Sequence, residues 1–226
     1  MLTYELIRSN RKTVAIHITK DATVELRAPF HTPKSEIDRF VFSKQDWINK
    51  QLAIRDQTLK KQAAFTLNYG NSITLQGNNY PLTARVGNRI GFDGKSFFLP
   101  YGLSAEEIKD AVIQIYKLVA KRLLTNKVVD YARQLGVSPA GIRVTSAKTR
   151  WGSCSNKNSI SFSWLLVIAD DNVIDYVVAH ELAHIREHNH SDRFWAIVAS
   201  IMPDYKARKK QLRTLQLRLE NEGWTE

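Results

Sequence analysis

The chain has 226 residues, of which 43% are hydrophobic and 24% are charged, as in an ordinary globular protein. No apolar run approaches the roughly 18 residues of a membrane span, and no signal-peptide-like stretch opens the chain, so we expect a cytoplasmic protein without membrane attachment. A single cysteine, Cys154, excludes an internal disulfide and suits a reducing compartment.

The net charge of +11 is concentrated in residues 1–103, which contain 15 lysines and arginines against 8 aspartates and glutamates. A basic surface favours polyanions such as nucleic acid, nucleotides or anionic lipid. No run of basic residues is long enough to act as an arm, so a solvated surface without a specific partner is the simpler interpretation. We therefore expect at most a weak nucleic-acid association through this basic N-terminal region.

Residues 1–103 are predicted to be rich in β-strands. Apolar and polar residues alternate in residues 14–18 and 24–28, with the period of two that half-buried strands require. Thr32-Pro33 predicts an N-cap followed by proline at the first helical position, and an apolar stripe from Ile37 to Leu52 follows it. After a polar stretch, four more strands are predicted, separated by turn residues: 72–76, 80–86, 89–92 and 96–99.

The rest of the chain is predicted to be mainly helical. Ser104-Ala-Glu-Glu107 is a capping box, and the helix behind it is expected to stop at Gly136. Residues 141–168 are rich in β-branched and aromatic side chains and predict a hairpin, and everything after Asp170 is predicted to be helical. The sequence thus predicts an α+β fold in two parts: a β-rich region, 1–103, and a second domain, 104–226.

Four of the six histidines lie between His180 and His190, in the stretch VVAHELAHIREHNHSDRFW. His180-Glu181-Leu182-Ala183-His184 is an HExxH motif in a predicted helix. His180 and His184 stack on one helix face, so both imidazoles can reach one ion at about 2.0–2.1 Å. Glu181 points roughly 100° around the helix, where it can meet a water molecule without being forced to ligate the metal.

A catalytic zinc site normally has three protein ligands and one open position. In a continuous helix, His188 would lie about 12 Å along the axis from His180, too far to share one ion. His190 is the better third ligand if the helix ends near His188 and Asn189 adopts the left-handed conformation. Two aspartates are alternative oxygen ligands: Asp192 and Asp204.

This set of residues predicts metal-assisted hydrolysis, in which Zn²⁺ makes hydroxide available at neutral pH and Glu181 acts as the general base. The developing oxyanion needs a donor besides the metal, for which the candidates are Arg150, His188 and Tyr205. For Trp151 and Trp164 the simpler role is hydrophobic packing, and for Cys154 that of a buried structural thiol.

The region from Arg143 to Arg213 resembles the YgjP-like family of predicted metal-dependent hydrolases, which are relatives of the SprT-like and WLM zinc peptidases. Four motifs carry the resemblance: RWGSCS at 150–155, DYVVAHELAH at 175–184, NHSDRFW at 189–195 and PDYKARKKQLR at 203–213. It implies a minimal zincin-like catalytic domain, with zinc held by His180, His184 and His190 and with Glu181 as the catalytic glutamate. In related zincins, the strand corresponding to Thr145–Trp151 binds an extended peptide by edge pairing, so Arg150 and Trp151 are also substrate-binding candidates.

Three functions remain open at this point. The first is a zinc-dependent metallopeptidase acting on extended or unfolded polypeptide. The second is a metal-dependent nucleoside triphosphate pyrophosphatase, an activity associated with YgjP-like proteins and favoured by Lys148 and Arg150 on the predicted substrate strand. The third is a DNA-associated protease module of SprT-like type, which rests on charge and analogy alone.

Overall fold

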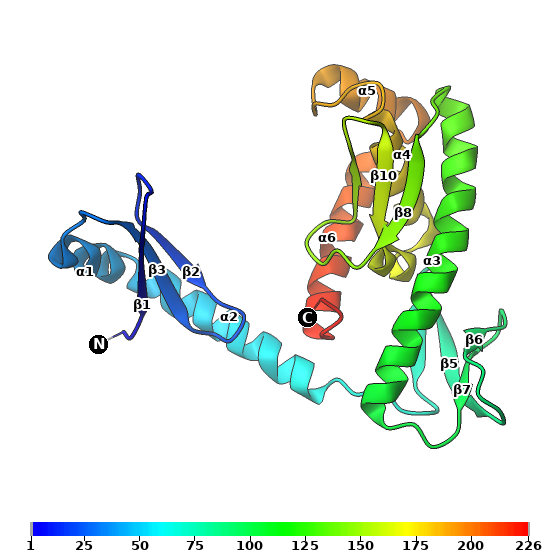
Figure 1. Cartoon of the computed structure of the whole chain (residues 1–226), viewed down its shortest axis with the longest axis horizontal. Coiled ribbons are helices and arrows are strands. Elements are labelled where there is room, and N and C mark those ends of the chain that lie inside the picture. The colour runs from blue at the N-terminus through cyan, green and yellow to red at the C-terminus, as the bar shows by residue number, and fades with distance from the viewer. Residues whose placement is uncertain (1, 226) are drawn as a thin grey trace. The chain divides into compact units, whose positions relative to one another are not determined.

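The computed structural model describes residues 2–225 and divides the chain into two units, Met1–Phe65 and Thr66–Glu226 (Figure 1). The sequence placed the boundary at residue 103, whereas the structure places it at Phe65. Residues 66–103 belong to the second unit because their strands pack on its core; the backbone N–H of Gln76, for example, donates to the carbonyl of Val167 at 2.7 Å.

The first unit is a three-stranded sheet with two helices. Strand β3 lies between a parallel β1 and an antiparallel β2. Its alternate side chains, Val24, Leu26 and Ala28, are buried, as the period-two pattern predicted. The elements of this unit are β1 (Glu5–Ser9), β2 (Ala15–Ile18), β3 (Val24–Pro29), α1 (Lys34–Ser43) and α2 (Gln45–Ala64).

The polar stretch after Leu52 is helical, although its sequence pattern did not predict a helix. Helix α2 continues to Ala64, although its only buried residue is Ile48. Most of this helix therefore lacks the buried apolar stripe from which a helix is predicted in a sequence. Helix-forming lysine, glutamine and alanine residues, and ion pairs such as Asp56–Lys60 at 2.8 Å, stabilise it locally.

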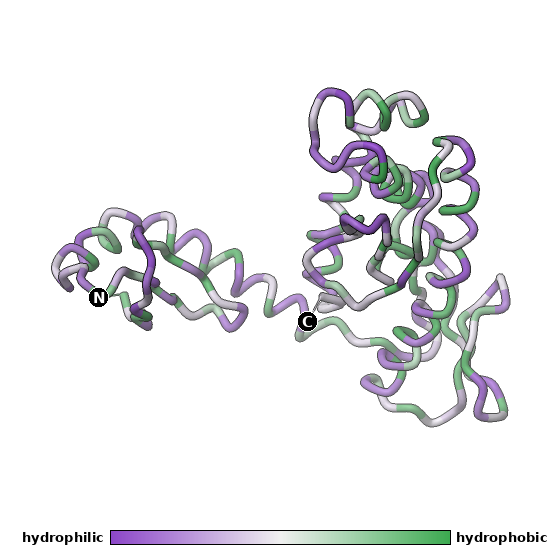
Figure 2. The backbone as a smooth tube through the Cα atoms, turned by 45° about the horizontal axis from the view of Figure 1, so that its top comes forward, coloured by the Kyte–Doolittle hydropathy of each residue, from purple (hydrophilic) through white to green (hydrophobic). Residues whose placement is uncertain are grey.

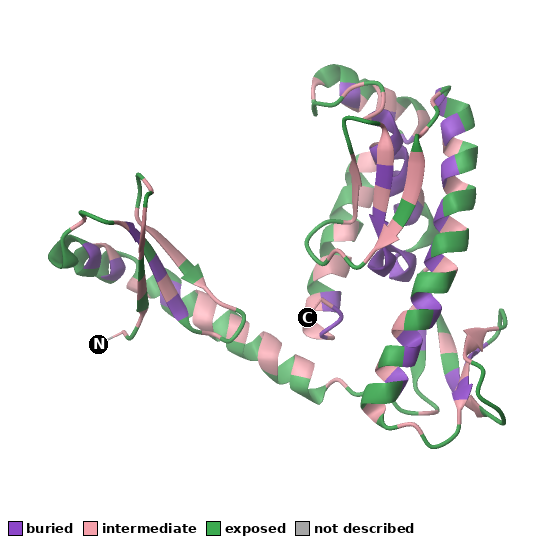
Figure 3. Ribbon diagram, in the orientation of Figure 1, coloured by how far each residue is buried: buried purple, intermediate pink, exposed green. Residues whose placement is uncertain are grey.

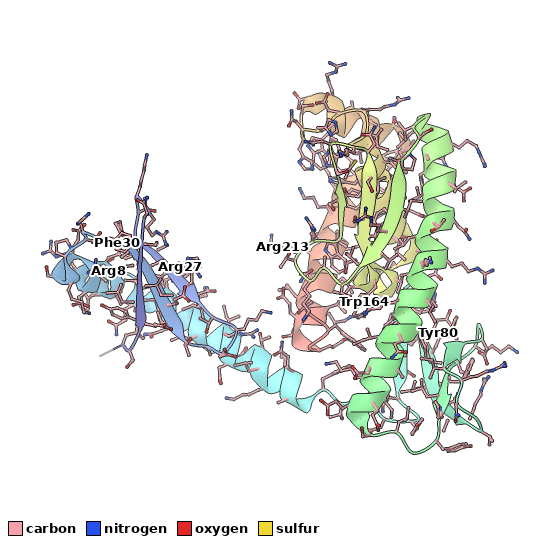
Figure 4. All side chains as sticks on the ribbon, in the orientation of Figure 1. Arg8, Arg27, Phe30, Tyr80, Trp164 and Arg213 are labelled. Atoms are coloured by element: carbon pink, nitrogen blue, oxygen red, sulfur yellow. The ribbon has the colours of Figure 1, made fainter. Side chains whose placement is uncertain are left out.

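The second unit begins with a four-stranded sheet of order β4-β5-β7-β6. An aromatic cluster joins this sheet to the rest of the unit, from Tyr80 and Phe97 through Tyr116 to Trp164. Figure 4 labels its two end members, Tyr80 and Trp164. Trp164 is 4% exposed, which confirms its predicted packing role. The strands are β4 (Ser72–Leu75), β5 (Asn78–Arg85), β6 (Gly91–Phe92) and β7 (Phe97–Pro100).

Helix α3 (Ala105–Leu135) is the longest element of the chain and has the predicted ends. Ser104 and Glu107 form both hydrogen bonds of a capping box, and Gly136 closes the helix at φ 61°. Buried positions recur along one face of α3 (Figure 3). Among the described residues, no helix combines the length and apolarity that a membrane span needs, and hydrophobic positions alternate with hydrophilic ones around the helices (Figure 2).

A second sheet of this unit has the order β8-β10-β9, with β8 parallel and β9 antiparallel to β10. Thr145–Trp151 was predicted as a strand, and this is wrong beyond Thr145. The chain must cross β10 between β8 and β9, so these residues form a loop. The elements are β8 (Gly141–Thr145), β9 (Gly152–Cys154), β10 (Ser159–Ser163), the 3₁₀ helix η1 (Trp164–Ile168), α4 (Asp171–Ala183), α5 (Asp192–Ile201) and α6 (Tyr205–Asn221).

Helix α4 is fixed to α3 by ion pairs from Lys127 to Asp171 at 2.9 Å and to Asp175 at 2.6 Å. Burial acts to raise the pKa of Asp171, but hydrogen bonds from Lys127 and Gln76 outweigh it and hold that pKa below its usual value. A carboxyl whose pKa is lowered by folding stabilises the fold at any pH above its pKa in the unfolded chain, which is about 3.9. This stabilisation is lost as the pH falls through the lower pKa of the folded protein.

We therefore expect Lys127→Met to lower the free energy of unfolding by about 1–2 kcal/mol at pH 7, because it removes hydrogen bonds to two carboxylates. The difference from the wild type should shrink below about pH 4, where the carboxyls become protonated. Urea unfolding at pH 7 and pH 3 measures both effects. Lys117→Met, on the exposed face of the same helix, is the control and should change neither value.

Candidate metal centre

Helix α4 and the loop behind it bring three histidines together. His180 lies in the last turn of α4, His184 caps its C-terminal end, and His190 returns from the loop. One ligand atom of each lies within 4.8 Å of the others, and the Nε2 atoms of His180 and His190 are 3.1 Å apart. His188 is exposed and lies outside this group, as do Asp192 and Asp204.

The turn that returns His190 differs from the predicted one. We expected α4 to run to about His188 and Asn189 to be left-handed, but α4 ends at Ala183 and Asn189 has no positive φ. A tight turn replaces the helix, with the N–H of Ile185 donating to Leu182 and that of Arg186 to Ala183. The predicted 12 Å separation of His188 from His180 therefore does not apply, because the helix is not continuous.

The geometry and protonation of the three imidazoles suit a metal ion. Two ligands at about 2.0–2.1 Å in a tetrahedral site lie about 3.3 Å apart, close to the 3.1 Å separation of the His180 and His190 nitrogens. The Nδ1–H of His184 donates to the carbonyl of Glu187 at 3.1 Å, which leaves Nε2 for a metal. Burial, reinforced by His184 and His190, lowers the pKa of His180 to about 3, and burial also lowers that of His184, so both are neutral as metal ligands must be.

Helix α5 supplies an aromatic wall behind the histidines. Ser191 caps this helix and accepts a hydrogen bond from the N–H of Phe194 at 3.4 Å, which places His190 directly before the first turn. Phe194 is fully buried and stacks on His184, with ring centroids 4.4 Å apart. Trp195 stacks on His190 at 5.6 Å and on Tyr205 at 5.0 Å. The exposed third histidine is thus held by an aromatic stack.

Glu181 lies on α4 beside the histidines and against strand β9. Among the described residues that are buried, Glu181 is the one with a charged side chain, at 6% exposure. Burial raises the pKa of Glu181 to about 7, and the nearby Arg150 guanidinium opposes this rise. Burial, with the charge of Glu181, also raises the pKa of the Cys154 thiol, which is half-buried rather than fully buried as predicted.

The other predicted candidates take different positions. Arg150 is exposed and close enough to Glu181 to affect its ionisation. Trp151 is half-buried, and its carbonyl accepts a hydrogen bond from the N–H of Ser163 at 2.9 Å. The ring of Tyr205 packs on Trp195.

Tyr176 also lies beside the histidines, although it was not among the residues predicted from the sequence. It lies four residues before His180 on the same face of α4, with its ring centroid 5.8 Å from that of His180. Burial, together with the charges of Glu181 and Tyr205, raises the pKa of Tyr176 to about 12. The sequence could have indicated this position, because Tyr176 is four residues before His180 and residues four apart share a helix face.

A glycine permits the close contact between β9 and Glu181. A Cβ atom at Gly152 would lie 2.6 Å from both Cγ and Oε1 of Glu181, whereas one at Gly141, in the same sheet, would be 3.6 Å from its nearest neighbour. We expect Gly152→Ala to displace the Glu181 carboxyl and to lower hydrolytic activity at least about 10-fold without releasing metal. Gly141→Ala is the matched control. Equal activities of the two variants would contradict a fixed position for Glu181.

Three clustered imidazoles beside a buried glutamate form an arrangement that suits a metallopeptidase centre. Residues 12–215 match the YgjP-like metallopeptidase domain, and the chain belongs to this family. The predicted family resemblance is thereby confirmed, and the six α-helices and three small sheets of the described chain confirm the predicted α+β class. A solved structure with some similarity is the metallopeptidase zymogen of Pyrococcus abyssi abylysin, at 21% identity and a TM-score of 0.38 over 40% of this chain and 92% of that one. No curated protein gives a significant match.

Proposed function

We propose that the protein is a zinc-dependent peptidase that acts on extended or unfolded polypeptide. The observation that carries this proposal is the meeting of three ligand nitrogens within 4.8 Å with a buried glutamate at a sheet edge. Imidazole ligands suit zinc among the metals that peptidases use. The ligands would be His180, His184 and His190.

When bound, zinc supplies a Lewis acid and lowers the pKa of a coordinated water to near 7. Glu181 accepts a proton from the attacking water and passes it to the leaving nitrogen of the peptide. A general base or acid works best when its pKa lies near the working pH, and burial places the pKa of Glu181 at about 7. Gly152 leaves the space in which the carboxyl is held.

A donor for the developing oxyanion is available from two residues. The phenol of Tyr176 stays protonated at neutral pH, because its pKa is raised to about 12, and its ring lies beside His180. Arg150 lies near enough to Glu181 to lower its pKa, on the loop before β9. We assign the role to Tyr176 first, because it is buried on the rigid helix that also carries two of the proposed ligands.

The sheet edge next to Glu181 favours a polypeptide substrate. Strand β9 pairs only with β10 among the described strands, so its other edge is free to hydrogen-bond an extended peptide. The edge used would thus be Gly152–Cys154 rather than the predicted Thr145–Trp151. The position of Arg150 next to Glu181 is the observation that favours the alternative, a nucleoside triphosphate pyrophosphatase. The DNA-associated module has only the basic charge of the N-terminal region in its support.

Substrate class is tested by incubating the zinc-loaded full chain in parallel with casein and with the four nucleoside triphosphates. We expect cleavage of casein that stops when the metal is chelated, and no release of pyrophosphate. Pyrophosphate release without casein cleavage would overturn the peptidase proposal in favour of its alternative.

The aromatic stack on His190 should strengthen metal binding. Without Trp195, the exposed His190 ring loses the ring that stacks on it, so we expect Trp195→Leu to weaken zinc affinity by about 10–100-fold. Trp195→Phe keeps a ring at this position and should restore most of the affinity. Competition with a fluorescent zinc chelator measures this, and circular dichroism checks the fold. Trp47→Leu, an exposed tryptophan of the first unit, is the control.

A further inference from the structure

A groove separate from the metal centre lies between helix α3 and strand β8. It has a volume of about 780 Å³, which is in the range of pockets that bind ligands. One stripe of α3, including Lys117, Leu118 and Lys121, forms one wall, and β8 with the residue after it forms the other. Leu118 is 65% exposed, so the groove presents apolar surface to solvent.

The β8 wall is an unpaired edge of the sheet. In the order β8-β10-β9, strand β8 has β10 as its strand neighbour on one side and no described strand on the other. An edge strand presents a row of backbone N–H and C=O groups at alternating positions. These groups match the alternating donors and acceptors of an extended polypeptide backbone, which adds to such an edge as a further strand.

The side chains that line the groove favour a negatively charged ligand. Lys117, Lys121 and Arg143 line it, and no aspartate or glutamate is among its lining residues. No aromatic residue lines it either, so it lacks the stacking platform that single-stranded nucleic acid uses. The charge thus fits an anion, and the strand edge and the apolar wall favour a peptide over a nucleic acid.

We propose that the groove between α3 and β8 docks an extended acidic polypeptide segment, which pairs with the free edge of β8 and whose carboxylates face Lys117, Lys121 and Arg143. This surface lies on the opposite edge of the same sheet from β9. A protein held here is bound outside the metal centre. The inference does not depend on the proposed function, because it uses none of the metal-site residues.

The test uses a fluorescent ten-residue peptide of alternating glutamate and valine and the full-length protein, with binding followed by fluorescence anisotropy. The double charge reversal Lys117→Glu with Lys121→Glu should weaken binding about tenfold or more. Lys206→Glu with Lys210→Glu, which has the same spacing on exposed positions of α6, is the matched control and should bind within about twofold of the wild type. Equal binding by both double variants would overturn the proposal.

A second peptide, N-methylated at alternate residues, separates strand addition from charge attraction alone. It should bind at least about tenfold more weakly, because it cannot form the edge hydrogen bonds. Hydrogen exchange should show that the unmodified peptide protects residues 141–146. Protection of 152–154 instead, equal binding of the N-methylated peptide, or tighter binding of a single-stranded oligonucleotide than of the acidic peptide would each contradict the proposal.

Discussion

Glu181→Gln should lower polypeptide hydrolysis by about 10²–10⁴-fold while the protein keeps its full zinc content. Glutamine has nearly the same shape as glutamate and fits against Gly152, but its amide cannot accept a proton from water. Glu181 is also outside the group of three histidines, so its loss should not release the metal. The measurement is initial rates on casein, combined with zinc analysis of the same samples.

Glu36→Gln, in the first turn of α1 in the other unit, is the matched control and should keep wild-type activity. If Glu181→Gln hydrolyses casein as fast as the control, Glu181 is not the base. If the variant instead loses its zinc, Glu181 has a role in holding the metal that the proposed mechanism does not give it.

The second large effect concerns the third metal ligand. Loss of a contact that supports a metal ligand weakens metal affinity by roughly 10–100-fold. His190→Ala should weaken zinc affinity by more than this, because it removes one of the three ligands themselves. His188→Ala should bind zinc as the wild type does, since His188 lies outside the histidine group although it is only two residues away. Equilibrium competition with a chelator measures both.

The opposite ranking, with His188→Ala losing zinc and His190→Ala keeping it, would show that the loop adopts a different arrangement when metal is bound. Circular dichroism of both metal-free variants separates loss of a ligand from loss of the fold.

The sequence was most informative where one local pattern determines the geometry. The spacing of His180 and His184 predicted that they share a helix face, and the structure places their ring nitrogens in one group with that of His190. The capping box at Ser104 and the glycine stop at Gly136 predicted both ends of α3, because those motifs act through neighbouring backbone groups.

It was least informative where distant segments decide the structure. The domain boundary could not be read from composition, because it depends on contacts such as that of Gln76 with Val167, 91 positions apart in the chain. The end of α4 at Ala183 was not predicted, and in the turn that follows it the ring of His184 bonds to the carbonyl of Glu187. The path of the loop between β8 and β9 follows from the pairing of both strands with β10.

The most direct test of the metal centre is the zinc X-ray absorption spectrum of the full-length protein loaded with one zinc ion. We expect three imidazole nitrogens and one oxygen at about 2.0–2.1 Å, falling to two imidazoles in His190→Ala. Two results would contradict the three-histidine centre. One is a sulfur ligand at about 2.3 Å, which would point to Cys154, the single cysteine of the chain. The other is an imidazole count that stays the same in His190→Ala.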